Sequence, residues 1–211
     1  MLKDKLLQRY VGAIAALAII SLLSSWTGVS SLHEISNSWD GFLWGMADPV
    51  LALDKFASIL AIGLLAAGNV RGRLIATTLI FANICGTLIY LWQINLPVTE
   101  IAIAIISIVL GIVLITSKQP NLWKLLIITA IAGLLQGYFN SESIIGAETM
   151  PSVMYIFGAA LTQYAVVMSS REIATQVSQA DLSGIWSRKI SLVGFAICAL
   201  GIVFLKNWSN L

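Results

Sequence analysis

Six polar side chains interrupt otherwise apolar parts of the sequence: Asp48, Asp54, Lys55, Gln136, Asn140 and Glu142. Charged and amide groups within apolar segments can bind an ion or a small polar solute, or they can bind one another. Asp48 and Lys55 are seven residues apart, and Gln136 and Asn140 are four apart, so each pair is predicted to share one face of a helix. If both segments cross a membrane, the two groups lie at the same depth and can form one polar site.

Each group also has a structural interpretation. Asp48 followed by Pro49 is typical of a helix start, with a capping carboxylate and a proline at the first helical position. Asp54 and Lys55 can neutralise each other or bind neighbouring helices. The two amides can hydrogen-bond across helices, which is common in membrane bundles. The residue types alone leave open whether this is a binding site.

The composition indicates the environment in which these groups act. Of 211 residues, 58% are hydrophobic and only 10% are charged, and the mean hydropathy is +0.91. Soluble domains carry about a quarter of their residues as charges. The chain is therefore expected to be an integral membrane protein with the lipid bilayer as its first partner. A soluble enzyme or a nucleic-acid binder is excluded, despite the net charge of +2.

Seven apolar segments approach the roughly 20 residues that a helix needs to cross a bilayer. They are residues 11–29, 50–69, 74–92, 101–116, 122–138, 152–168 and 190–205. The sequence predicts an all-α bundle of about seven transmembrane helices, with residues 1–211 forming one polytopic membrane domain. Small residues at helix-contact spacing, notably Gly133 with Gly137, predict close packing between helices.

The distribution of lysine and arginine predicts the orientation, because short cytoplasmic loops are enriched in both. A cytoplasmic amino terminus places 10 of the 12 basic residues on that side: Lys3, Lys5, Arg9, Arg71, Arg73, Lys118, Lys124, Arg171, Arg188 and Lys189. The carboxyl terminus is then extracytoplasmic.

Two connecting segments have predictable structure. Residues 31–47 are too apolar for a free loop and are expected to fold onto the outer bilayer surface or over the bundle. Residues 171–189 are expected to form a cytoplasmic helix at the interface.

Residues 41–55, GFLWGMADPVLALDK, followed by AIGL at residues 61–64, resemble a motif of the HupE/UreJ family. The family pattern is HPxxGxDH followed by an apolar helix with a similar AVGL step. Pro49 and Asp54 match this pattern at the right spacing. Members are small polytopic membrane proteins associated with nickel supply to hydrogenase and urease. The resemblance extends over roughly residues 41–170 and implies a metal permease or accessory protein, of the nickel or cobalt type.

The most diagnostic positions of the family differ in this chain. In the first motif, Asp48 and Lys55 replace the two histidines, and Ala52 replaces the glycine. The second family pattern, HGxAHGxE, corresponds here to QGYFNSE at residues 136–142. Gly137 is kept, whereas amides replace both histidines and the glutamate comes one place early.

These replacements change the metal chemistry that the resemblance implies. Imidazole suits nickel, whereas carboxylate and amide oxygens suit harder ions, and an ammonium repels any cation. We therefore expect no nickel binding of the family type, and no other cofactor is evident. The single histidine, His33, cannot form a metal site alone. Cys85 and Cys198 lie in apolar runs without a CxxC motif.

Two functions follow as hypotheses. The first is a HupE/UreJ-like permease or accessory protein with a remodelled, histidine-free polar site. The second is a non-transporting structural or assembly subunit of a larger membrane complex, with other membrane proteins or further copies of the chain as partners. No catalytic triad or phosphate-binding loop is present in the sequence, so we do not expect an enzyme. A membrane of the bacterial inner or thylakoid-like type is expected.

Overall fold

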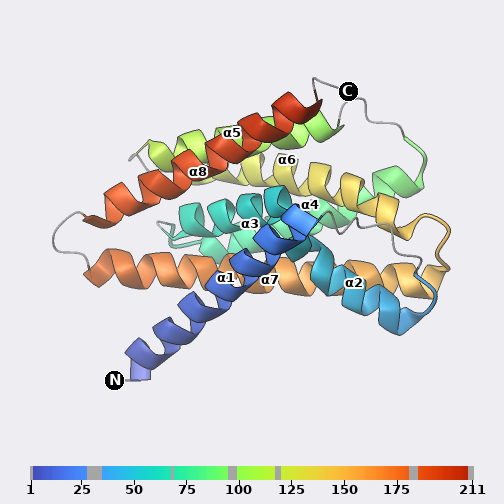
Figure 1. Ribbon diagram of the computed structural model, residues 1–211, viewed down its shortest axis with the longest axis horizontal. Helices are drawn as coiled ribbons and strands as arrows, with labels where there is room; N and C mark the ends of the chain where they lie inside the picture. Colours follow the sequence, from blue (N-terminus) through green and yellow to red (C-terminus); the bar gives the residue numbers. More distant parts are fainter. Residues whose placement is uncertain are drawn as a thin grey trace.

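The computed structural model describes residues 2–27, 35–67, 69–94, 99–116, 120–180 and 185–208. All regular structure within these residues is helical. The elements are α1 (Leu2–Thr27), α2 (Ser38–Leu51), α3 (Leu53–Ala66), α4 (Gly72–Leu91), α5 (Thr99–Ile115), α6 (Leu122–Asn140), the 3-10 turn η1 (Ser141–Ile144), α7 (Thr149–Ala180) and α8 (Ile185–Trp208). Figure 1 shows them as an elongated bundle. The predicted all-α fold is confirmed.

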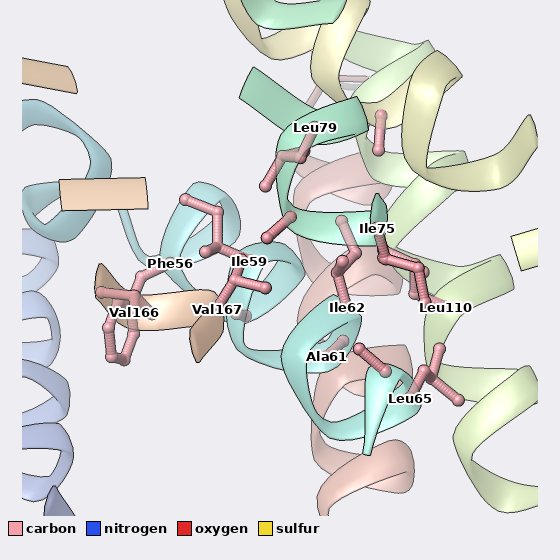
Figure 2. Close-up of a cluster of buried hydrophobic side chains, with 14 of the residues drawn as sticks. Phe56, Ile59, Ala61, Ile62, Leu65, Ile75, Leu79, Leu110, Val166 and Val167 are labelled. Carbon is pink, nitrogen blue, oxygen red and sulfur yellow. The ribbon is translucent and has the colours of Figure 1, made fainter. Parts of the chain in front are cut away.

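α3 is the central helix of the bundle, because it contacts every other helix. Its apolar side chains are enclosed on all sides, and Ile59, Ala61 and Ile62 have no exposed surface. Figure 2 shows residues of α4, α5 and α7 packed around it, including Leu79, Leu110 and Val167. We call these residues the central apolar cluster: Phe56, Ile59, Ala61, Ile62, Leu65, Ile75, Leu79, Leu110, Val166 and Val167. Burial of this cluster fixes where α3, and the residues at its start, lie.

A sharp bend separates α2 from α3. The two helices are bent by 77°, and Ala52 between them has an extended conformation with φ −86° and ψ 113°. Pro49 in the last turn of α2 lacks an N–H and weakens the helix there. Residues 38–51 therefore form a helix of their own, which lies along α7. This corrects the expectation of one continuous span over residues 50–69.

Three pairs of helices pack closely through glycine: α2 with α7, α4 with α6, and α5 with α8. A Cβ added to Gly45 would collide with the backbone carbonyl of Tyr155, and one added to Gly137 would collide with that of Asn83. A Cβ on Gly111 would lie 2.7 Å from the carbonyl oxygen of Gly194. The absence of a side chain at these positions lets the backbones approach. The predicted contact role of Gly133 and Gly137 is confirmed, since both face α4.

The apolar helices suit a membrane, as the composition predicts. Among the described residues, four helices are long and apolar enough to cross it, or five if α2 and α3 count as one broken span. α1 and α5 contribute the shorter apolar stretches Gln8–Ser24 and Ile101–Ile115. Exposed large side chains such as Phe81, Phe157 and Phe195 give the bundle an apolar outer surface. The seven-span count stays a prediction.

The ends of the bundle differ in charge. Taking α2 and α3 together, successive segments run in alternating directions, so α1 begins at one end and α8 ends at the other (Figure 1). Arg71, Arg73 and Lys124 adjoin the starts of α4 and α6. Glu142 and Glu148 flank the turn at the opposite end. This separation agrees with the predicted topology, whose orientation in the membrane remains to be tested.

The segment after residue 170 differs from the expectation. Residues 171–180 continue α7 without interruption, and residues 185–189 begin α8. Residues 171–189 therefore do not form one helix of their own in the described part of the chain, and the position of this segment at the cytoplasmic interface stays a prediction. α7 has 32 residues, or about 48 Å at 1.5 Å per residue, which exceeds the roughly 30 Å of a bilayer core. Hydropathy located the end of the apolar segment, but the helix itself extends past it.

We expect Gly137→Ala to destabilise the protein by about 1–3 kcal/mol, because its methyl group would press on the backbone of α4. Gly12→Ala is the matched control, since a Cβ there meets nothing within 4 Å. In open space the change from glycine to alanine should stabilise a helix slightly. Thermal unfolding in detergent measures both effects, and equal behaviour of the two variants would contradict the packing described above.

Single-cysteine labelling tests the orientation in a background with Cys85 and Cys198 replaced by alanine. Ile145 is 68% exposed at the acidic end, and Asn121 is exposed at the basic end. Because basic loops are retained in the cytoplasm, an impermeant maleimide should label Ile145→Cys in intact cells. Asn121→Cys should react only after permeabilisation. The reverse pattern would invert the topology.

Candidate functional site

Asp48 and Lys55 lie on either side of the helix break and form an ion pair. Asp48 is in the last turn of α2, and Lys55 is the third residue of α3. The Lys55 Nζ lies 2.9 Å from the Asp48 Oδ2. The two residues are only 4% and 3% exposed, respectively. Such burial is unusual for charged side chains unless they are paired.

The break, rather than helical periodicity, brings these charges together. The interpretation of Asp48 as a helix start is wrong, because α2 continues to Leu51 and Pro49 lies inside it. Asp48 and Lys55 also do not share one helical face, since they belong to two helices bent by 77°. The bend at Ala52 turns α3 so that its first turn faces the end of α2. A continuous helix would have separated the two charges by about 10 Å along its axis.

Two aromatic residues complete the surroundings of the pair. The Tyr155 hydroxyl, on α7, donates a hydrogen bond of 2.9 Å to the same Asp48 Oδ2. The Lys55 Nζ lies 5.1 Å from the centre of the Phe139 ring on α6, a geometry that favours a cation over the ring face. Side chains from α2, α3, α6 and α7 therefore meet at this point.

The helix ends on both sides of the break favour this arrangement of charges. The carbonyl groups at the end of α2 carry partial negative charge, which stabilises the ammonium of Lys55. Asp54 lies in the first turn of α3, where the partial positive charge of the helix start favours a carboxylate. Asp54 is half-buried, and the ion pair described for Lys55 is with Asp48 instead. The two carboxylates thus have different structural roles.

Apolar residues flank the ion pair on both sides. The Tyr155 ring packs with Ile35 and Ile144 in a small apolar cluster. On the other side, Phe56 directly follows Lys55 and begins the central apolar cluster. The pair therefore lies in a low-dielectric environment, where its attraction is strong and the loss of either partner is costly.

The amide residues lie near the pair, whereas Glu142 does not. Gln136 and Asn140 are in the last turns of α6 and are each 2% exposed. They flank Phe139, whose ring faces the Lys55 ammonium. Glu142 is exposed on η1. The structure thus buries two of the three predicted residues from this segment, on the part of α6 whose Phe139 faces Lys55.

Sequence reasoning missed two buried polar residues on α7. Tyr155 binds Asp48 from 107 positions away along the chain, and Gln163 is fully buried two turns further along the helix. The signal for Gln163 was its position inside a predicted span, where any amide needs a partner. Tyr155 gave no comparable signal, because tyrosine is common in apolar segments.

The arrangement has the chemistry of a cation site that already holds a cation. The Asp48 carboxylate and the Phe139 ring both contact the Lys55 ammonium. Among the described residues, no three His, Cys, Asp or Glu side chains come together as a metal site requires. His33 lies outside the described part of the chain.

We expect Lys55→Met and Asp48→Asn each to lower the free energy of unfolding by about 3–5 kcal/mol, because each leaves one unpaired buried charge. The double variant should recover much of that loss. Combining Lys55→Met with Asp54→Asn is the matched control and should recover little. Thermal unfolding in detergent of the wild type and these four variants measures the effects. Additive losses for the Asp48 and Lys55 changes would exclude the pair.

Comparison with known proteins confirms the family resemblance. A family model described as HupE / UreJ protein matches residues 10–204, nearly the whole chain. No curated protein and no solved structure matches. The match includes every helix from α2 to α7 as well as the residues at the helix break. The chain therefore belongs to the HupE/UreJ family.

Proposed function

We propose that this protein is a membrane permease or accessory protein of the nickel or cobalt type whose cation position is filled by its own lysine. The observation that carries the proposal is the buried ion pair of Asp48 and Lys55 at a helix break. In this proposal the protein acts within the bilayer and is not an enzyme. We expect a membrane of the bacterial inner or thylakoid-like type.

Broken helices support a role in handling a solute. In many transporters, substrate and ion sites lie where a transmembrane helix is interrupted, because the helix ends present free carbonyl and N–H groups. The bend at Ala52 creates such a point. Charged residues in this environment are costly, so their presence favours a functional role.

The donor atoms do not fit nickel. The family motif has histidines where this chain has Asp48 and Lys55, and imidazole is the ligand that suits nickel. A cation entering the site would also have to displace the Lys55 ammonium from its carboxylate, to which it is bound at 2.9 Å. We therefore propose that the protein keeps the family scaffold but does not bind nickel through the family's histidine positions, and that it uses no other cofactor.

A second function, a structural or assembly subunit of a larger membrane complex, is favoured by the same ion pair. Asp48 is already bound by Lys55 and by Tyr155, so the pair can serve stability alone. Partners would then be other membrane proteins or further copies of this chain. Purification in mild detergent with mass spectrometry of bound proteins would reveal such partners, whereas a solute flux in proteoliposomes would favour a permease.

Calorimetric nickel titration tests the proposal. The wild-type protein should give no micromolar binding, because its site lacks imidazole and contains an ammonium. Asp48→His combined with Lys55→His restores both family histidines at two positions whose side chains meet, and should gain nickel affinity. Lys55→Met, which removes the ammonium without adding a ligand, is the control. Tight nickel binding by the wild type, lost in Asp54→Asn, would overturn the proposal.

A further inference from the structure

Two buried amide side chains near the end of α6 lack hydrogen-bond partners among the residues that the structure describes. Gln136 and Asn140 are each 2% exposed. Neither the amide nitrogen nor the amide oxygen of either residue has a hydrogen-bond partner among the described residues. Each amide can donate two hydrogen bonds and accept two. This part of α6 therefore presents both donors and acceptors that the described chain leaves unused.

Such groups are expensive to leave unpaired inside a membrane protein. Moving an amide from water into an apolar environment without a hydrogen bond carries a large penalty, and a bilayer supplies no water from its core. Most buried polar groups have a partner, either in the protein or in a bound molecule. The two amides together point to a bound molecule.

The surroundings of the amides indicate where that molecule would bind. Gln136 and Asn140 are one helical turn apart on α6. Between them in the sequence, Gly137 packs against the backbone of Asn83 on α4, and the Phe139 ring faces the Lys55 ammonium. We call Gln136 and Asn140 the amide site.

The charges nearby restrict the kind of ligand. Asp48 and Lys55 neutralise each other, and the amides of Gln136 and Asn140 carry no charge. Neither amide supplies a charge that would attract a metal ion or an anion. A neutral molecule that donates and accepts hydrogen bonds matches the available atoms, because carboxamides offer both.

We propose that the amide site binds a small uncharged molecule that both donates and accepts hydrogen bonds. Water and a small primary amide share this chemistry. The inference rests on the proposed function in one respect, since it requires Asp48 to be neutralised by Lys55. The inference names the class of ligand that the amide site binds. A nickel titration alone does not define that class.

Radiolytic labelling with X-rays tests for a bound molecule of water, because hydroxyl radicals formed at bound water modify adjacent side chains. Phe139 directly precedes Asn140 on α6 and is partly exposed, so bulk water also contributes to its labelling, whereas Phe56 is buried in the central apolar cluster and reports the background. Phe139 should therefore be modified several-fold faster in the wild type than in Gln136→Leu with Asn140→Leu. Gln176→Leu is the control, because the Gln176 amide donates to Glu172 at 2.7 Å, away from the site.

Acetamide tests whether the amide site binds a small primary amide. Binding would raise the thermal midpoint of the wild type and of Gln176→Leu in detergent, but not that of the double leucine variant. Fast Phe139 labelling that acetamide suppresses supports a site open to small amides, and fast labelling without any acetamide effect supports water as the ligand. Equal labelling of Phe139 in the wild type and in the double leucine variant, with no acetamide shift, would overturn the proposal.

The nickel titration separates this inference from the proposed function. If the wild type binds nickel tightly and Phe139 is labelled fast, the proposed function is contradicted and the amide site is supported. If the wild type does not bind nickel, and Phe139 is labelled equally in the wild type and the double leucine variant with no acetamide shift, the amide site alone is contradicted.

Discussion

The ion pair between Asp48 and Lys55 depends on a break in the backbone, and the break in turn depends on its surroundings. Irregular backbone at membrane depth is tolerated only where protein encloses it, because lipid offers no hydrogen bonds. α7 packs along both α2 and α3, and its Tyr155 binds the carboxylate directly. The central apolar cluster holds α3 in place on the other side. The positions of Asp48 and Lys55 are thus fixed by contacts with residues far away in the sequence.

Glycine packing makes this enclosure possible. Gly41 and Gly45 on α2 face the backbone of α7 at Pro151 and Tyr155, and Gly158 on α7 faces the backbone of α2 in return. Because no side chain separates these backbones, α2 lies close enough to α7 for the Tyr155 hydroxyl to reach Asp48. The same principle joins α4 to α6 and α5 to α8. Without a hydrophobic driving force between helices in lipid, such close contact is the main source of packing energy.

The replacement of imidazole by an internal ion pair changes what the family scaffold can do. A histidine pair leaves coordination positions for an exchangeable metal, whereas an ammonium on the same chain cannot leave. Lys55 already has a carboxylate and an aromatic face beside its ammonium. With the charge balanced internally, the neutral amides of α6 become the part of the site with unused hydrogen-bonding capacity.

The sequence by itself determined the membrane class, the family and most helix positions, because hydropathy and motif spacing are local properties. The segments predicted at residues 74–92 and 122–138 correspond closely to α4 and α6, and Gly133 and Gly137 were correctly assigned to a helix contact. The tertiary structure alone decided which carboxylate binds Lys55. Asp54 is adjacent in the chain, yet the bend at Ala52 presents Asp48 instead. It also decided that Tyr155 joins the pair and that α7 continues beyond its apolar segment. These features depend on the direction of a bend and on contacts between distant residues, and neither leaves a local pattern in the sequence.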